Sequence, residues 1–217
     1  MEVCTNQVHN MKIGTRPQIR FVAVVASLMA VYVPYRMWVN RDITWRWKDE
    51  VQLADGARVW IARTEVREIL GGGEPFRGPS RTTKSARLEL PGGSKPVVWE
   101  HRMEPMVVER GLSSVQWIVI ATPIWCNEYR EFGSPTPPYV QFEYVDGKWR
   151  HQAIAPRWYG KPSNLLMNDQ QREAHDGGSI TAEQIVKMNY IVFKDLLSIE
   201  KSAKMNCDRE QNYRSKK

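Results

Sequence analysis

An uncharged apolar run at residues 21–35, bounded by Arg20 and Arg36, restricts what this chain can fold into. Fifteen helical residues span only about 22 Å, which is less than the roughly 30 Å hydrocarbon core of a membrane. Extension to residue 39 nearly closes this gap if the Arg36 side chain reaches toward the headgroups. Aromatic side chains of the kind enriched at the membrane interface lie in its second half: Tyr32, Tyr35 and Trp38. We therefore expect residues 21–39 to anchor the chain in a membrane.

Two other interpretations of this run stay open. One is a cleaved signal peptide, with Lys12, Arg16 and Arg20 as its charged region and Met11 as the true start. A small-x-small cleavage site is not evident, because Leu28 stands where a small residue is needed. The other is a buried helix of a soluble cytosolic protein, which the charged flanks count against. We expect a single-pass protein of a bacterial inner membrane with a periplasmic domain; cleavage would instead release that domain into the periplasm.

The charge distribution argues against nucleic-acid binding. The chain has a net charge of +7, of which +4 lies in residues 1–41 and +3 in residues 200–217. Residues 42–199 carry 20 basic and 20 acidic side chains and are therefore neutral. A nucleic-acid-binding domain concentrates its positive charge on the folded surface that meets the phosphates. We therefore expect no nucleic-acid partner.

Beyond the apolar run, the residue pattern predicts a sheet. From Thr44 onward apolar residues alternate with a period of two, which is typical of β-strands. Asp55-Gly56 and Asp146-Gly147 each stand between alternating runs and favour hairpin turns. A third hairpin is predicted from 87–90 and 97–99, and the β-branched run 115–121 predicts a central strand. The Gly- and Pro-rich residues 70–84 predict an exposed loop.

The pattern changes to a helical period near the C-terminus. Thr181 and Gln184 form a capping-box pattern, and apolar residues then recur every three or four positions, which predicts a helix over roughly 181–204. The expected fold class is α+β, with an N-terminal membrane-anchor helix followed by a mostly antiparallel β-sheet domain with a C-terminal helix. We expect the tail and anchor in residues 1–41, the globular domain in 42–204 and a polar tail in 205–217.

No motif predicts a catalytic residue, a cofactor or a metal site. Gly71-Gly72-Gly73 lacks the frame of a phosphate-binding loop, and the four histidines lack the spacing of a zinc site. Cys126 and His151 could serve as nucleophile and base in an enzyme, although any chain with a few such residues offers such a pair. If the domain is exported, Cys126 and Cys207 could form a disulfide; three unpaired thiols are the alternative.

Residues 121–139 form the most distinctive segment, because four aromatic residues, four prolines and a cysteine stand between two predicted strands. Aromatic and arginine side chains on a rigid loop are typical of an interaction surface. The alternative is a crossover whose rings cover one end of the sheet. The candidate interaction residues are Trp125, Tyr129, Arg130 and Phe132, together with Trp158 from a later loop as a stacking platform.

Three stretches carry a likeness to known proteins. They are residues 48–58 (KDEVQLADGAR), residues 121–142 with Cys126 and the run PPYVQF, and Asp146-Gly147-Lys148-Trp149. Over roughly residues 45–167 the chain resembles a group of uncharacterised proteobacterial exported or membrane-anchored proteins. It differs from them at Trp125, where a smaller residue is expected before the cysteine. That group has no assigned activity, so the resemblance implies bacterial origin and export and gives no mechanism.

These observations lead to one main hypothesis. We expect a bacterial membrane-anchored envelope protein with a non-catalytic binding or accessory domain, whose partner is another protein or an envelope polymer. The alternatives are an enzyme acting on an envelope substrate, and a soluble cytosolic protein with the apolar segment in its core.

Overall fold

The computed structural model describes residues 26–30, 32–34, 42–70, 80–112, 115–189 and 197–207. The chain divides into two units, of which the second, Asp42–Ile69 with Arg81–Lys217, contains the core of two β-sheets. This unit is a mixed α+β domain built mostly from β-sheet with a few short helices, which confirms the fold class at that level.

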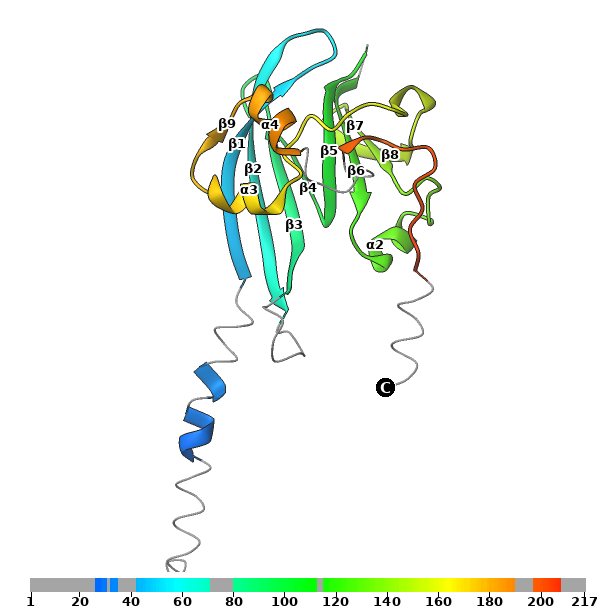
Figure 1. Cartoon of the computed structure of the whole chain (residues 1–217). Helices are drawn as coiled ribbons and strands as arrows, with labels where there is room; N and C mark the ends of the chain where they lie inside the picture. Colours follow the sequence, from blue (N-terminus) through cyan, green and yellow to red (C-terminus); the bar gives the residue numbers. More distant parts are fainter. Residues whose placement is uncertain are drawn as a thin grey trace, which may run out of the picture. The chain divides into compact units, whose positions relative to one another are not determined.

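The first sheet has five strands in the order β4-β3-β2-β1-β9 (Figure 1). Their bounds are β1 Asp42–Gln52, β2 Arg58–Leu70, β3 Ser80–Leu90, β4 Val97–His101 and β9 Ser179–Ile180. β1 pairs with β2 in an unbroken antiparallel register, and β9 joins the other edge of β1 in parallel. The β1–β2 turn contains Asp55-Gly56, with Gly56 at a φ of 83°, so the predicted hairpin is confirmed.

The second sheet is antiparallel, in the order β5-β6-β7-β8. Its strands are β5 Met103–Arg110, β6 Val115–Pro123, β7 Val140–Val145 and β8 Lys148–Ala153. β6 lies inside the sheet, as the apolar run predicts, and the Asp146-Gly147 hairpin joins β7 to β8. β5 was not predicted. Pro105 interrupts its pattern and sits at a register shift on the edge of the sheet, where proline is tolerated.

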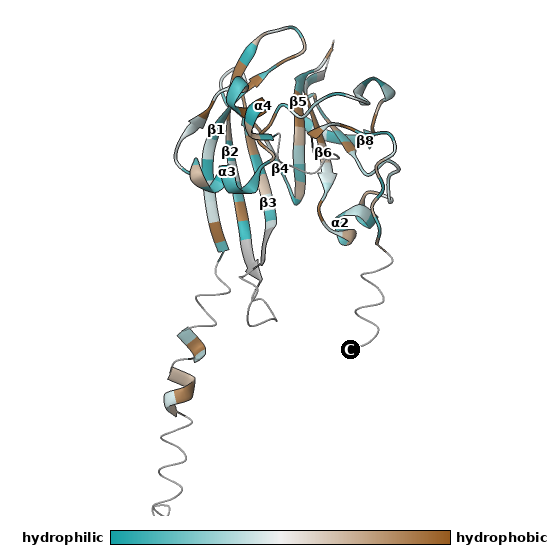
Figure 2. Cartoon of the chain, in the orientation of Figure 1, coloured by the Kyte–Doolittle hydropathy of each residue, from teal (hydrophilic) through white to brown (hydrophobic). Residues whose placement is uncertain are grey.

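The apolar core lies where the inner faces of the two sheets meet. The chain crosses from one sheet to the other at Arg102, between the end of β4 and the start of β5. Side chains from both sheets form this core. Figure 2 shows apolar residues along β5, which borders it. Its fully buried members include Val51, Ile61, Leu88 and Trp99 from the first sheet, and Val108, Val119 and Phe142 from the second.

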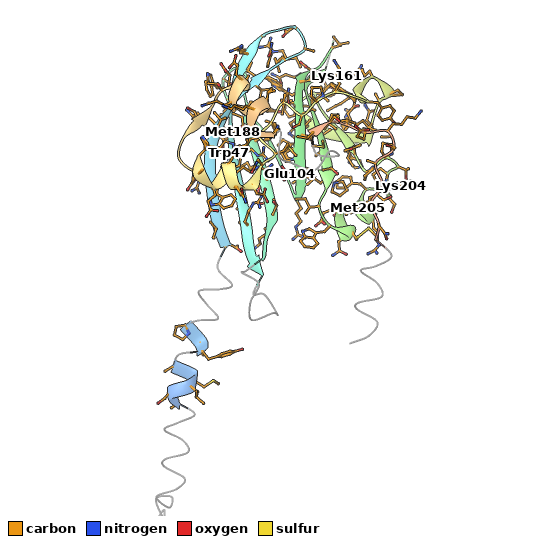
Figure 3. All side chains as sticks on the ribbon, viewed as in Figure 1. Trp47, Glu104, Lys161, Met188, Lys204 and Met205 are labelled. Atoms are coloured by element: carbon orange, nitrogen blue, oxygen red, sulfur yellow. A yellow bond between two sulfur atoms is a disulfide. The ribbon has the colours of Figure 1, made fainter. Side chains whose placement is uncertain are left out.

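Two short helices, α3 (Asp169–Ala174) and α4 (Ala182–Asn189), pack on β1. The predicted capping box is present, because the Thr181 N–H donates to Gln184 Oε1 at 2.9 Å and the Gln184 N–H donates to Thr181 Oγ1 at 3.3 Å. Beneath these helices lies an apolar cluster that includes Trp47, with Met188 packed against it (Figure 3).

The predicted helix over 181–204 is wrong in its last part. Residues 190–196 lie outside the described residues, Leu197 is helical, and the chain leaves the helical conformation after it. The N–H groups of Ser163 and Ile199 donate to the carbonyls of Leu197 and Lys161, and Ser198 forms a β-bridge with Pro162. This pairing satisfies the backbone groups of both segments. Ile199 is buried in an apolar cluster, so its apolar character comes from this packing and not from a helix.

The predicted loop over 70–84 is also too long. β3 begins at Ser80, so the loop's last five residues belong to a strand, and β2 continues to Leu70 at its other end. Residues 71–79 lie outside the described residues.

Within the predicted anchor, residues 26–30 and 32–34 are helical, and the rest of 21–39 lies outside the described residues. Large apolar side chains here are exposed to solvent: Leu28, Met29, Tyr32 and Val33. Within the part of the chain that the structure describes, no helix combines the length and the apolar character needed to cross a membrane.

Candidate functional site

A pocket of about 650 Å³ lies beside helix α2 (Cys126–Glu131). The helix contributes Glu128 and Glu131, and Phe132 follows at its C-terminal end. The opposite wall comes from the crossing between the sheets, at His101, Arg102 and Met103, with further residues of β2 and β3. The pocket therefore lies where four separate segments of the chain meet, and one of them is the Pro-rich aromatic stretch.

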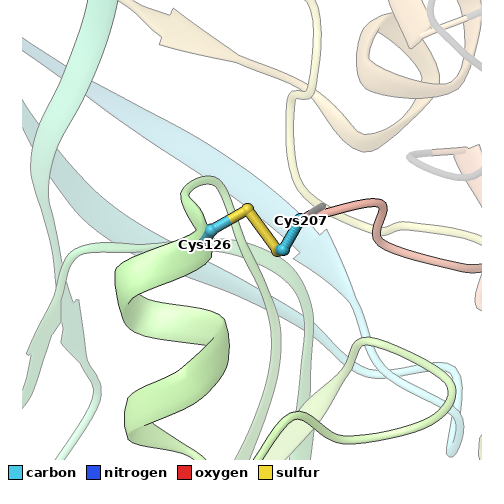
Figure 4. The surroundings of a disulfide bond; sticks show 2 residues. All are labelled: Cys126 and Cys207. Atoms are coloured by element: carbon cyan, nitrogen blue, oxygen red, sulfur yellow. A yellow bond between two sulfur atoms is a disulfide. The ribbon is translucent and has the colours of Figure 1, made fainter. Parts of the chain in front are cut away.

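Helix α2 is held in place at both of its ends. At its start, Cys126 forms a disulfide with Cys207, and their Cα atoms are 5.5 Å apart, in the usual range (Figure 4). At its end, the half-buried Phe132 ring packs edge-on against Phe142 of the core, with ring centroids 5.7 Å apart. The first contact ties the helix to the C-terminal segment and the second ties it to the second sheet.

Glu128 is the most unusual group in the pocket. Its residue is 5% exposed, and its Oε2 atom has no hydrogen-bond partner among the residues that the structure describes. The nearest cation is Arg102, whose Nη1 is 3.8 Å from Glu128 Oε1, beyond hydrogen-bonding distance. A buried carboxylate oxygen without a donor is unfavourable, and it is the kind of group that a ligand can satisfy.

Aromatic rings form the inner side of the pocket. His101 lies against Phe142 at 4.6 Å and Phe132 at 5.9 Å between ring centroids, and Phe132 also meets His151 at 5.1 Å. Burial lowers the pKa of His101, although the nearby Glu131 carboxylate opposes the shift. His101 is therefore neutral at pH 7 and adds no positive charge to the pocket.

The structure separates the predicted interaction residues into two groups. Arg130 is exposed and Trp125 and Tyr129 are half-buried, so these three reach the surface at α2, while Phe132 lines the pocket. Trp158 is 5% exposed and donates its indole N–H to Gln141 Oε1 at 2.8 Å. Its ring is thus part of the core, and this corrects its expected role as a surface stacking platform.

The pair suggested for nucleophilic catalysis is not available as such. The Cys126 sulfur is bonded to Cys207, and a disulfide sulfur is not a thiolate nucleophile. His151 is exposed on β8, with its ring against Phe132. In the described part of the chain, no three His, Cys, Asp or Glu side chains are grouped so that they could hold a metal ion.

A second polar feature, which the sequence reasoning missed, is a buried network of charges under α3. It joins three arginines to four carboxylates: Arg63, Arg67 and Arg172 with Asp49, Glu65, Glu104 and Asp169. All of these side chains are at most 8% exposed except that of Asp169. The only local sign of it is the alternation of β2, which places Arg63, Glu65 and Arg67 on the same face of the strand as Ile61.

Two arginines of this network bind the backbone of the segment 165–167, which packs over it. Arg63 and Arg172 both donate to the carbonyl of Leu166, and both also bind Glu104 of β5. Arg63 and Arg67 lie over the rings of Trp47 and Trp45, each with Cζ 5.0 Å from the ring centroid. The contacts of the network hold α3 and the 165–167 segment to both sheets.

The carboxylates in the network have opposite pKa shifts. Burial raises the pKa of Asp49 to about 6, because attraction to Arg63 does not offset the loss of solvent. Burial also acts to raise the pKa of Glu65, but Arg172, Arg63 and Arg67 together lower it to about 2. Asp49 is therefore the least satisfied charge of the network, and within the described part of the chain its Oδ2 atom has no hydrogen-bond partner.

Comparisons of the chain with known proteins add no further constraint. No protein-family model, no curated protein and no solved structure matches it.

Proposed function

We propose that this chain is a non-catalytic binding domain of the bacterial envelope, held at the membrane by residues 21–39, and that its contact surface is the α2 surface. The α2 surface consists of Trp125, Tyr129, Arg130 and the pocket beside them. The observation that carries this proposal is the attachment of α2 at both ends, by the disulfide to the C-terminal segment and by Phe132 to the core. A surface held in this way presents aromatic and arginine side chains with little loss of entropy on binding.

Two features support a location outside the cytoplasm. The Cys126–Cys207 disulfide is typical of an oxidising compartment, such as the periplasm. The apolar side chains that are exposed at residues 28–33 are expected to be covered in the cell, and a lipid bilayer would cover them. The neutral charge of residues 42–199 supports a protein or an envelope polymer, and not a nucleic acid, as the partner.

An enzymatic role has less support. The disulfide removes the thiolate from Cys126, and the polar groups in the pocket are carboxylates and cations near a neutral His101. Without an activated nucleophile in the pocket, binding of a partner explains the α2 surface with fewer assumptions.

Photocrosslinking in intact cells tests the proposed contact surface. A photoreactive phenylalanine analogue in place of Tyr129 should give a discrete adduct, and Arg130→Glu should abolish that adduct. The matched control places the same analogue at Trp60, an exposed aromatic residue on β2 that does not line the pocket. Identical products from both positions, or none from Tyr129, would exclude the α2 surface as the contact site.

A further inference from the structure

The pocket beside α2 is lined by more negatively than positively charged side chains. Its lining carries three carboxylates, of Glu100, Glu128 and Glu131, against the two cations Lys84 and Arg102. Lys84 binds Asp42 at 2.7 Å, and Glu100 already faces Arg87 at 3.2 Å. The cations of the lining therefore leave the buried Oε2 atom of Glu128 without a donor.

The position of this oxygen limits which cation fits. Glu128 Oε1 faces Arg102, so the buried Oε2 is the one oxygen atom of this carboxylate that lacks a partner among the described residues. A guanidinium group binds a carboxylate best through two parallel hydrogen bonds, whereas an ammonium is a compact charge that one oxygen can hold. The geometry favours a primary ammonium group.

The rest of the lining suits an apolar stem. The half-buried Phe132 supplies apolar surface near Glu128, and Val66 extends it on β2. An aromatic ring also attracts an ammonium ion that approaches its face. A ligand with an ammonium head and a short alkyl chain would satisfy both parts of the pocket.

We infer that the pocket binds a primary alkylammonium group, with the head on Glu128 and the alkyl stem along Phe132 and Val66. This inference rests on the proposed function and names the chemistry that the α2 surface recognises. The group belongs either to a free diamine or to a lysine-type side chain of an envelope peptide.

Calorimetric titration of the full-length chain in a non-ionic detergent tests this inference with two probes. 1,5-Diaminopentane represents the free amine, and Nα-acetyl-lysine N-methylamide represents the peptide side chain. We expect saturable binding of at least one probe and none of the Nε-acetylated lysine analogue, which keeps the stem and loses the charge. Binding confined to the diamine assigns a free amine, and stronger binding of the lysine compound assigns a peptide. Absence of saturable binding by both overturns the inference.

Two substitutions should change the affinity in opposite directions. Glu128→Gln removes the acceptor charge and should weaken binding by about tenfold or more, whereas Glu173→Gln removes an exposed charge on α3 and should leave it unchanged. Arg102→Gln removes the competing cation and should strengthen binding severalfold, a gain that loss of folding cannot imitate. Equal affinities of the wild-type chain and Glu128→Gln, or weaker binding by a folded Arg102→Gln chain, would overturn the inference.

The crosslinking experiment keeps this inference separate from the proposed function. A Tyr129 adduct without amine binding would refute the ligand class and leave the contact surface standing. Amine binding without an adduct would refute the partner contact and leave the pocket as a small-molecule site.

Discussion

The indole N–H of Trp47 donates a 2.8 Å hydrogen bond to Oδ1 of Asp49, two residues further along the same buried face of β1. This bond is the closest support that Asp49 has, since Arg63 Nη1 stays 3.7 Å from Oδ2. A single neutral donor does not compensate a buried carboxylate for the water that it loses.

We expect Asp49 to make stability depend on pH. Its pKa is about 6 in the folded state against an ordinary value of 3.8, so the folded chain binds more protons than the unfolded chain between these values. The contribution of Asp49 to the free energy of unfolding therefore falls by about 2–3 kcal/mol as the pH rises from 4 to 7. Asp49→Asn removes this titration. The free energy of unfolding of Asp49→Asn, relative to wild type, should increase by that amount from pH 4 to pH 7.

Denaturant unfolding of both proteins across this pH range measures that difference. Glu65, whose pKa is lowered to about 2, contributes stability that is lost as pH falls below about 4.5, and this loss is common to both proteins. A difference that stays constant with pH would show that Asp49 does not titrate in this window.

The buried network should be sensitive to loss of one arginine. Arg172→Ala leaves Glu104 and Glu65 short of a cation, and removal of one partner from a buried ion pair costs roughly 3–5 kcal/mol. Arg87→Ala breaks an exposed pair with Glu89 and Glu100 and should cost about 1 kcal/mol or less. Thermal unfolding of both variants at pH 7 tests this contrast, and equal losses would contradict it.

Loss of the disulfide should destabilise the domain. The bond joins residues 81 positions apart, and the loop-closure entropy that it removes from the unfolded chain corresponds to about 4 kcal/mol. Cys126→Ser should therefore lower the unfolding free energy by up to this amount, and reduction of the wild-type chain should have the same effect. Cys4→Ser is the matched control. Thiol titration of the denatured, unreduced wild-type chain should find one free thiol among its three cysteines.

The proposed anchor can be tested with a single charge. Leu28→Lys places an ammonium in the apolar run, where it opposes insertion by roughly 3 kcal/mol, and should move the chain from the membrane fraction to the soluble fraction. Leu112→Lys makes the same change at an exposed leucine beyond β5 and should leave the distribution unchanged. Protease added to spheroplasts should digest the domain and leave a fragment near residues 1–40 in the membrane. A protected, soluble chain would refute both the anchor and the orientation.

Local turn chemistry explains why much of the sheet could be predicted from the sequence. Asp55-Gly56 and Asp146-Gly147 favour hairpin turns through their own backbone preferences, and the alternating runs on either side define the paired strands. The capping box at Thr181 is equally local. The predicted helix does not reach residue 204, because the backbone pairing of residues 197–199 depends on residues 161–163, which are distant in sequence.

The buried charges and the pocket could not be predicted in the same way. On β2, Arg63, Glu65 and Arg67 share the inward face with Ile61, but charged residues at alternate positions ordinarily indicate a solvent face. Their burial depends on Arg172 and Glu104, which other segments provide. Likewise, Glu128 and Phe132 were part of a distinctive segment, yet nothing local indicates that His101 and Arg102 stand opposite them.

The tether between Cys126 and Cys207 also sets an order of events during biosynthesis. The second cysteine is made 81 residues after the first, so α2 emerges long before its bond can close. If the domain crosses the membrane as it is made, α2 lacks its disulfide until the C-terminal segment has followed it into the oxidising compartment. A chain whose translocation stops before Cys207 would then expose α2 without its disulfide. Only chains that have been translocated as far as Cys207 would present the fixed α2 surface.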